Sequence, residues 1–341
     1  MKFNQNKKVN KRNYFSIMMV FLICLMMSFM DGCSKEKEGN TVVKDGKKQV
    51  RIGYFPNVNH AQGMIVKNKK WLEEELGDDY EVSWVAFNAG PAEVEALFAG
   101  EIDMGYIGPI PAITANVNSN GDYKIIAGGA NGGEALIGAK GVKPSAQGLK
   151  GKKIAVPQKG NTQHLALLAL LNEKELEVGN GEDKVEIVEA ENADILNLLN
   201  QGAVEAALIP EPWVSILLQD KDVELLHNYD DIWQEGGNPT STVIGNQDYL
   251  KENGRIYEAF IKAHKQATEY LKENKEDAIA IIRQEMKDMT GKELAEDVLK
   301  TAMGRMEFSA VPNEQGILEF AKLSKEEGFI KKEPDVLFFQ K

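Results

Sequence analysis

The chain has 341 residues, 43% of them hydrophobic, so it is long enough to build the cores of two domains. Its 40 basic and 52 acidic residues leave a net charge of −12, which argues against a nucleic-acid partner, because such a partner requires a basic face. A small anionic ligand is still compatible with this charge, since surface charge is screened beyond about 8 Å and backbone dipoles can dominate inside a cleft.

The N-terminus has the pattern of a secretion signal. Five basic residues come first, an apolar run extends from Tyr14 to Met30, and Cys33 follows after two intervening residues. This pattern predicts a signal peptide over residues 1–32, acylation of Cys33, and a polar flexible tether over residues 33–49. The alternative is an uncleaved anchor, because the apolar run is only slightly shorter than a span of roughly 20 residues. Either interpretation places the folded part outside the cytoplasm, at the extracellular face of the membrane.

Strand and helix patterns alternate in the first half of the folded part. We expect strands at residues 50–55, 81–87, 102–106, 124–130 and 134–139, and helices at residues 61–76, 91–99 and 110–118. This order predicts an α/β lobe with a mostly parallel sheet flanked by helices.

A second series of the same kind begins at Lys152. We expect strands at residues 153–156, 185–188, 204–209 and 223–226, and helices at residues 162–175, 194–200 and 212–219. A strand over 240–246 returns to the first lobe, and the remainder is helical. The predicted fold is therefore a two-lobe α/β clamp, with residues 50–139 and 243–341 in lobe 1 and residues 140–242 in lobe 2. Crossings near residues 140–143 and 239–243 would permit hinge closure; the alternative is one rigid domain with a helical extension.

One pattern occurs twice, 102 residues apart. Residues 96–109 and 198–211 both show the end of a helix, a capping glycine (Gly100 or Gly202), an acidic position, a short apolar strand and a helix breaker. The repetition indicates two similar lobes, and ligands bind at loops that leave the carboxyl ends of strands in such sheets.

Enzyme signatures are absent from the sequence. It contains no phosphate-binding loop motif and no Gly-x-Ser-x-Gly turn, and its four histidines do not have metal-ligand spacing. Both cysteines, Cys24 and Cys33, lie in the signal region, so thiol chemistry is not expected in the folded part. The sequence favours binding without a catalytic step, a cofactor or a metal.

The candidate ligand-binding residues lie in loops after predicted strands. Asn161 or Thr162 can cap the helix that follows Gly160, whose free amides suit an anion, although capping alone requires the same residues. The loop after the first strand adds three polar side chains, and Glu211 and Trp213 suit a cationic or apolar part of the ligand or are simply lobe core. The full set is Asn57, Asn59, His60, Gly90, Pro91, Gly108, Pro109, Gly133, Glu134, Gly160, Asn161, Thr162, Glu211 and Trp213.

Several stretches resemble the solute-binding proteins of ABC importers for taurine, alkanesulfonates and nitrate. They are Ile52-Gly53-Tyr54-Phe55-Pro56-Asn57, Phe87-Asn88-Ala89-Gly90-Pro91, Gly100-Glu101-Ile102-Asp103, Leu149-Lys150-Gly151-Lys152-Lys153-Ile154-Ala155-Val156 and Glu211-Pro212-Trp213. The resemblance covers about residues 50–330, and their order and spacing together are specific.

The resemblance implies a type II two-lobe binding fold, a lipid-anchored monomeric receptor, and delivery of a small organic anion, such as a sulfonate, to an ABC permease and its ATPase. By resemblance, the anion would meet the Gly160–Thr162 helix start and the turns at Gly90 and Gly108, and Glu211 would take the amine of a taurine-like ligand. The alternatives are nitrate, a thiamin pyrimidine precursor stacked on Trp213, Trp84 and Tyr106, and, remotely, an enzyme like the related pyrimidine synthase.

Overall fold

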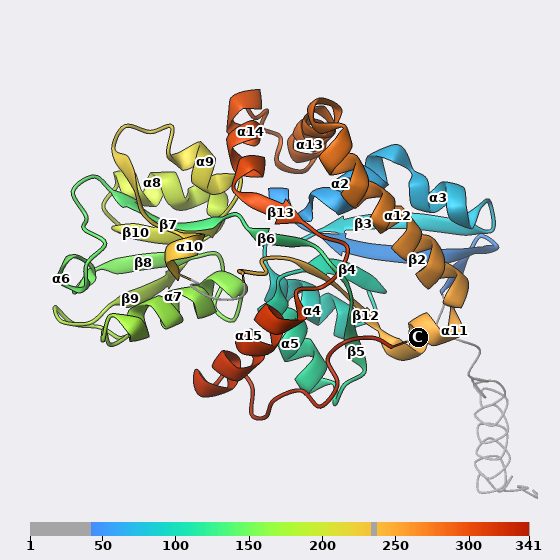
Figure 1. The fold of residues 1–341 in the computed structure, drawn as a ribbon, viewed down its shortest axis with the longest axis horizontal. Helices are drawn as coiled ribbons and strands as arrows, with labels where there is room; N and C mark the ends of the chain where they lie inside the picture. The colour runs from blue at the N-terminus through green and yellow to red at the C-terminus, as the bar shows by residue number, and fades with distance from the viewer. Residues whose placement is uncertain (1–41, 233–236, 341) are drawn as a thin grey trace, which may run out of the picture. The chain divides into compact units, whose positions relative to one another are not determined.

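A computed structural model describes residues 42–232 and 237–340 of the chain (Figure 1). The predicted signal peptide, Cys33 and residues 33–41 of the predicted tether lie outside the described residues. The end of the predicted tether is not a flexible segment, because residues 43–44 and 47–49 belong to strands. Within these residues, no helix combines the length and hydropathy needed to cross a membrane.

The first lobe is built on a six-stranded sheet. Its central order is β3-β2-β4-β12-β5, with the short β1 added to the start of β2. Strands β2 to β5 share one direction, while β12 runs the opposite way between β4 and β5. The bounds are β1 Val43–Lys44, β2 Lys47–Tyr54, β3 Tyr80–Ala86, β4 Met104–Ile107, β5 Tyr123–Gly128 and β12 Thr242–Asn246.

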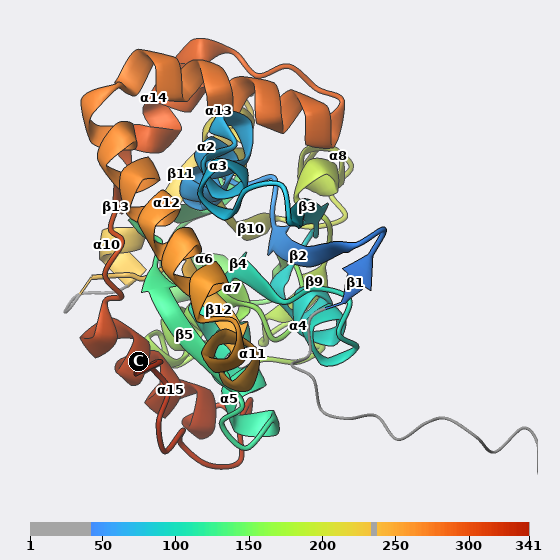
Figure 2. The ribbon, with the colours of Figure 1, turned by 90° about the vertical axis from the view of Figure 1, so that its right-hand side faces the viewer.

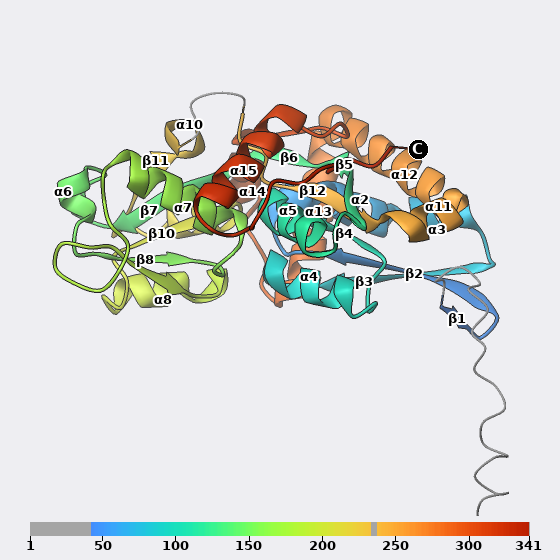
Figure 3. The ribbon, with the colours of Figure 1, turned by 90° about the horizontal axis from the view of Figure 1, so that it is seen from below.

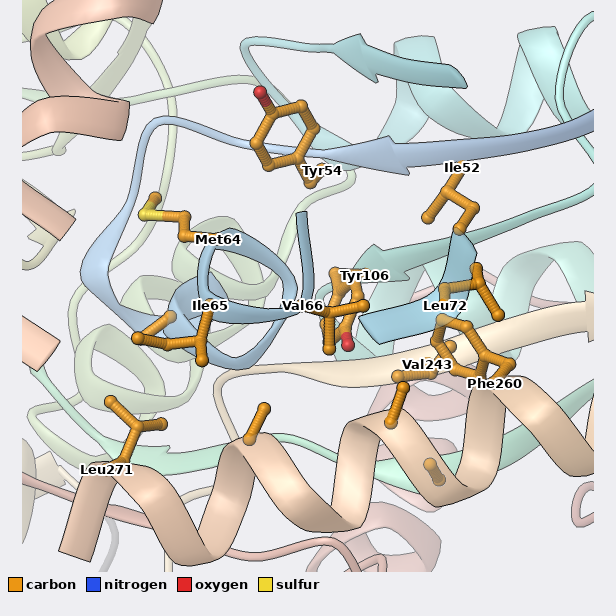
Figure 4. Close-up of a cluster of buried hydrophobic side chains, with 14 of the residues drawn as sticks. Ile52, Tyr54, Met64, Ile65, Val66, Leu72, Tyr106, Val243, Phe260 and Leu271 are labelled. Atoms are coloured by element: carbon orange, nitrogen blue, oxygen red, sulfur yellow. The ribbon is translucent and has the colours of Figure 1, made fainter. Parts of the chain in front are cut away.

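Helices cover both faces of this sheet (Figure 2). One face packs against α2 Ala61–Lys69, α3 Trp71–Leu76, α12 Gly254–Glu273 and α13 Lys275–Thr290, and the other against α4 Gly90–Phe98, α5 Pro109–Asn118 and α15 Glu314–Glu326. Figure 4 shows the first of these cores, where Ile52 and Tyr106 from the sheet meet Val66 of α2 and Phe260 of α12. The predicted helix over 61–76 is two helices, because Lys70 adopts a left-handed conformation with φ 56°.

The second lobe contains a five-stranded sheet in the order β11-β7-β10-β8-β9. Side chains alternate along its strands: Ile154 and Val156 face the cluster around α7, while Ala155 faces the cluster around α8 and α9. Only β7 runs against the other four strands. The bounds are β7 Glu134–Ala139, β8 Lys153–Val156, β9 Glu186–Glu189, β10 Ala206–Pro210, β11 Val223–Asn228, α6 Ala146–Leu149, α7 Thr162–Glu173, α8 Ile195–Asn200, α9 Trp213–Leu217 and α10 Tyr229–Ile232.

The first crossing between the sheets lies earlier in the chain than expected. The strand over 134–139 was placed in the first lobe, but it pairs with β10 and β11 of the second sheet. The chain therefore passes between the sheets just before Glu134, not at residues 140–143. There it meets the second crossing: Gly132 donates its amide to Asn238, and Thr240 donates its amide to Ala130.

The C-terminal segment joins this crossing region. Strand β13 Met306–Phe308 pairs with β6 Ala130–Gly132, and α14 Glu296–Gly304 packs beside α9 of the second lobe (Figure 1). The remaining elements are the short helices η1 Val58–His60, η2 Asn192–Asp194 and α11 Gln247–Glu252. Seen from below in Figure 3, α5 and α15 lie in front of the first sheet, and α7 lies in front of the second.

Candidate functional site

A narrow cavity lies where the two lobes meet, and we call it the inner cavity. Its empty volume, which includes space open to solvent, is about 350 Å³. None of its lining residues is charged. They are Phe55, Asn57, Asn59, His60, Asn88, Ala89, Gly90, Gly108, Pro111, Pro157, Asn161, Thr162, Gln163, Asn192, Pro210 and Thr240.

Three helices begin at the wall of the inner cavity. Gly90 starts α4, Gly108 caps α5, and Asn161 and Thr162 start α7. A helix start carries a partial positive charge and unpaired amide groups, so three of them around one space favour an anion. The positive potential here therefore comes from backbone dipoles, since the lining has no lysine or arginine.

The lobes touch at Gly108 and Thr162. A methyl group added at Gly108 would lie 2.3 Å from Oγ1 of Thr162, which is far inside van der Waals contact. A glycine is thus needed at position 108 for the two walls to come this close.

His60 offers a neutral hydrogen-bond donor to the cavity. Burial lowers the pKa of His60 to about 3, so its ring is uncharged at neutral pH. Nδ1 accepts the amide of Phe55 at 3.2 Å, which leaves the proton of the neutral ring on Nε2. His60 lines the inner cavity, and Nε2–H is the ring's donor for a ligand there.

Three buried polar atoms of the cavity wall have no hydrogen-bond partner within the protein. They are Oδ1 of Asn59, Oγ1 of Thr162 and Oδ1 of Asn192, on residues that are 3%, 2% and 8% exposed. Buried polar groups are nearly always hydrogen-bonded, so these atoms fit partners supplied by a ligand or by water.

A chain of hydrogen bonds connects the start of α7 to the second crossing. Asn161 donates to Gln163, and Nε2 of Gln163 donates to Glu134 at 2.7 Å. The second carboxylate oxygen of Glu134 accepts Nδ2 of Asn238 at 2.7 Å. Glu134 therefore lies behind the wall and positions the residues that line it.

The structure brings seven of the fourteen candidates together in the lining: Asn57, Asn59, His60, Gly90, Gly108, Asn161 and Thr162. Four others are neighbours that do not line it. Pro91 and Pro109 occupy the first turns of α4 and α5, Gly160 donates its amide to His164, and the carbonyl of Gly133 accepts the amide of Glu211.

Glu211 does not present its carboxylate to the inner cavity, which corrects the expectation that it would take a ligand amine. It is fully buried and accepts the amide and the hydroxyl of Ser215, both at 2.9 Å. Arg305 approaches it at 3.5 Å from the C-terminal segment. Desolvation raises the pKa of Glu211, while the hydrogen bonds from Ser215 and the charge of Arg305 act to lower it. Glu211 therefore has its partners within the protein and serves a structural role.

Trp213 joins the lobes without lining the inner cavity. Its Nε1 donates to Oδ1 of Asn57 at 3.0 Å, and Val58 donates its amide to the carbonyl of Glu211 at 3.0 Å. The three rings suggested for stacking a pyrimidine do not meet: Tyr106 is fully buried against His264, and Trp84 packs against Tyr54. None of them is in the lining of the inner cavity.

Several residues that line the inner cavity were not among the candidates predicted from the sequence. Gln163 lies next to a predicted cap, Asn192 follows a predicted strand, and Thr240 lies on a predicted crossing, so position alone could have indicated them. Phe55 and Pro157 gave no chemical signal. Within residues 42–232 and 237–340, no group of three or more His, Cys, Asp or Glu side chains could hold a metal ion.

The architecture is the two-lobe periplasmic-binding-protein fold. The alkanesulfonate-binding protein SsuA from Xanthomonas axonopodis pv. citri, bound to MOPS, has a similar structure with a TM-score of 0.69 at 23% identity, covering 86% of this chain and 98% of that one. Two sheets flanked by helices and joined by two crossings confirm the predicted fold class.

The chain belongs to the NMT1-like family, whose model matches residues 44–284. A putative aliphatic sulfonates-binding protein of Escherichia coli (strain K12) is 28% identical over 251 residues, covering 70% of this chain and 71% of that protein. The taurine-binding periplasmic protein of the same organism is 29% identical over 184 residues, covering 53% and 55%.

Proposed function

We propose that this chain is the substrate-binding protein of an ABC importer and that it holds the head group of a small organic sulfonate in the inner cavity. The main observation behind this proposal is that α4, α5 and α7 all begin at the wall of the inner cavity, whose lining contains no charged side chain. Sulfonate oxygens are acceptors that match His60 Nε2–H, the Thr162 hydroxyl and the amides at the start of α7. The sulfonate-binding and taurine-binding relatives support the same class of ligand.

The site favours a sulfonate without an amine close to sulfur. A taurine ammonium would find no carboxylate in the lining of the inner cavity, because Glu211 is occupied by Ser215, and the acceptors open to it are the uncharged Oδ1 atoms of Asn59 and Asn192. We therefore expect ethanesulfonate to bind at least as tightly as taurine.

Calorimetry of the protein with ethanesulfonate, taurine, nitrate and a thiamin pyrimidine precursor tests the proposal. Replacing Thr162 by valine keeps the shape and removes one donor, so ethanesulfonate affinity should fall by about tenfold or more. Thr301→Val, at an exposed position of α14, is the matched control and should leave affinity unchanged. Binding of nitrate or the pyrimidine in preference to every sulfonate would overturn the choice of ligand.

We also propose that the mature protein is a monomeric receptor anchored at the extracellular face of the membrane through an acylated Cys33, and that it delivers its ligand to a permease. The support is the signal pattern before Cys33. Metabolic labelling with a radioactive fatty acid should mark the wild-type protein but not Cys33→Ser, and the variant should leave the membrane fraction. Equal labelling of both proteins would exclude Cys33 as the site.

A further inference from the structure

A second, larger cavity adjoins the inner cavity, and we call it the outer chamber. Its empty volume is about 630 Å³, against about 350 Å³ for the inner cavity. Its lining consists of Pro56, Asn57, Asn88, Glu191, Asn192, Ala193, Trp213, Met289, Thr290 and Lys292.

Three asparagines separate the two spaces. Asn57, Asn88 and Asn192 line both of them. Asn57 accepts Trp213 Nε1 at 3.0 Å, and Asn88 donates to Oε1 of Glu191 at 3.1 Å, so two of the three are held by hydrogen bonds between the lobes. The third, Asn192, keeps Oδ1 without a partner. A partition made of side chains can be displaced when the lobes separate.

The two spaces differ in chemistry. The inner cavity is narrow and lined mainly by glycine, proline and polar side chains, which suits a head group but not a long apolar tail. The outer chamber places an indole and a thioether, Trp213 and Met289, on its wall, with Glu191 and Lys292 exposed to solvent. Both apolar groups pack well against hydrocarbon and aromatic surfaces.

Part of the outer chamber is outside the family match. Met289, Thr290 and Lys292 follow residue 284, where the match ends. The inner cavity, in contrast, lies wholly within residues 44–284. Residues that hold the head group are thus in the matched region, while part of the outer wall comes from a segment beyond it.

We propose that the outer chamber binds an apolar tail of the ligand, with Met289 as a specificity-determining residue beside Trp213. This inference rests on the proposed function, because the head group in the inner cavity fixes where the tail begins. The ligand class is an organic sulfonate whose apolar body extends beyond two carbons, past the asparagine partition.

A series of straight-chain sulfonates tests this proposal by calorimetry on the whole protein. Each methylene that enters an apolar site should tighten binding about three- to fourfold. From ethanesulfonate to hexanesulfonate we expect at least about a tenfold gain. Met289→Ala should remove most of that gain and leave ethanesulfonate affinity unchanged.

Met303→Ala is the matched control. Met303 is also a half-buried methionine packed against the first core, but it lines a different groove. It should keep the full dependence on chain length. Affinity that stays flat or falls with chain length, or an equal loss for short and long sulfonates in Met289→Ala, would overturn the tail site alone. Failure of every sulfonate to bind would overturn the proposed function as well.

Discussion

The two repeated units, residues 96–109 and 198–211, have the same local backbone structure but different loops. In the first, Gly100 has φ 68° and Asp103 accepts the amide of Arg51 at 2.8 Å. In the second, Gly202 has φ 66° and Glu205 accepts the amide of Lys153, also at 2.8 Å. The acceptor lies 52 residues after the donor in both units. Each acid therefore ties the start of its strand, β4 or β10, to the neighbouring parallel strand, β2 or β8.

The units diverge in what lies beneath that strand. Glu93 of α4 is fully buried without a hydrogen-bond partner, and a methyl group at Gly53 or Gly105 would lie about 2 Å from its Oε1. At the same offset of 102 residues, the second unit has the apolar set Ile195, Ala155 and Ala207 in one buried cluster. The fold thus accepts a purely apolar group at this position, and the carboxyl is a peculiarity of the first lobe.

They diverge again in the loops after the strands. Gly108 opens its loop onto the inner cavity, whereas Glu211 turns its carboxylate to Ser215 and Arg305. One loop contributes to binding and the other connects the second lobe to the C-terminal segment. Similar positions in a repeat therefore do not have similar roles.

The largest expected effect follows from adding a methyl group at Gly108. Gly108→Ala would place Cβ 2.3 Å from Thr162 Oγ1, on the opposite lobe, and keep the walls apart. Affinity for ethanesulfonate should fall by about ten- to a hundredfold, as for an overpacked contact of roughly 1–3 kcal/mol. The melting temperature without ligand should change little, because the contact joins lobes. Gly254→Ala, with no atom within 4 Å, is the control for both measurements; unchanged affinity in Gly108→Ala would place the ligand elsewhere.

A substitution that affects the loop at Glu211 should lower the stability of the protein and leave its affinity for ligand unchanged. Arg305→Met leaves Glu211 buried without its cation, so the free energy of unfolding should fall by about 1–3 kcal/mol, below the usual cost of a broken buried pair because Arg305 is 25% exposed. Urea denaturation measures this loss, and ethanesulfonate affinity should stay within about twofold. Arg283→Met removes the exposed pair with Glu293 and should cost at most about 0.5 kcal/mol. A large loss of affinity with little loss of stability would restore Glu211 as a ligand group.

Replacing Asp103 or Glu205, the equivalent acids of the two units, should have smaller effects on stability, and the two effects should differ. Asp103→Asn weakens a buried acceptor that also pairs with Arg51 at 2.6 Å, and should cost about 1–2 kcal/mol in the free energy of unfolding. Glu205→Gln, at a half-buried position with an amide partner only, should cost less than about 1 kcal/mol. Equal losses in the same urea measurement would mean that the ion pair of Asp103 adds nothing to the shared backbone contact.

Local signals predicted more of this molecule than long-range contacts did. The glycine caps and the cap at Asn161 follow from neighbouring residues, and the structure confirms them. The sequence could not show which of the two sheets contains β7, because a short apolar strand is compatible with either sheet. The Glu211 carboxylate is held by Ser215, four residues further along the chain, and by Arg305 in a distant segment; the second contact could not be predicted from local spacing.

The last prediction concerns the pH dependence of stability in the first lobe. Burial raises the pKa of Glu93 well above its ordinary value, so the folded protein binds this proton more tightly than the unfolded chain does. Stability contributed by the protonated form is therefore present at low pH and is lost as pH rises from the ordinary value towards the raised one. Glu93→Gln has no such proton, so the melting temperature of the variant relative to wild type should increase steadily between pH 5 and pH 8. Ile195→Val, at the equivalent position of the second lobe, should give a difference from wild type that is constant over the same range. A constant difference for Glu93→Gln would show that Glu93 does not change its protonation on folding, and the two lobes would then be electrostatically equivalent at this position.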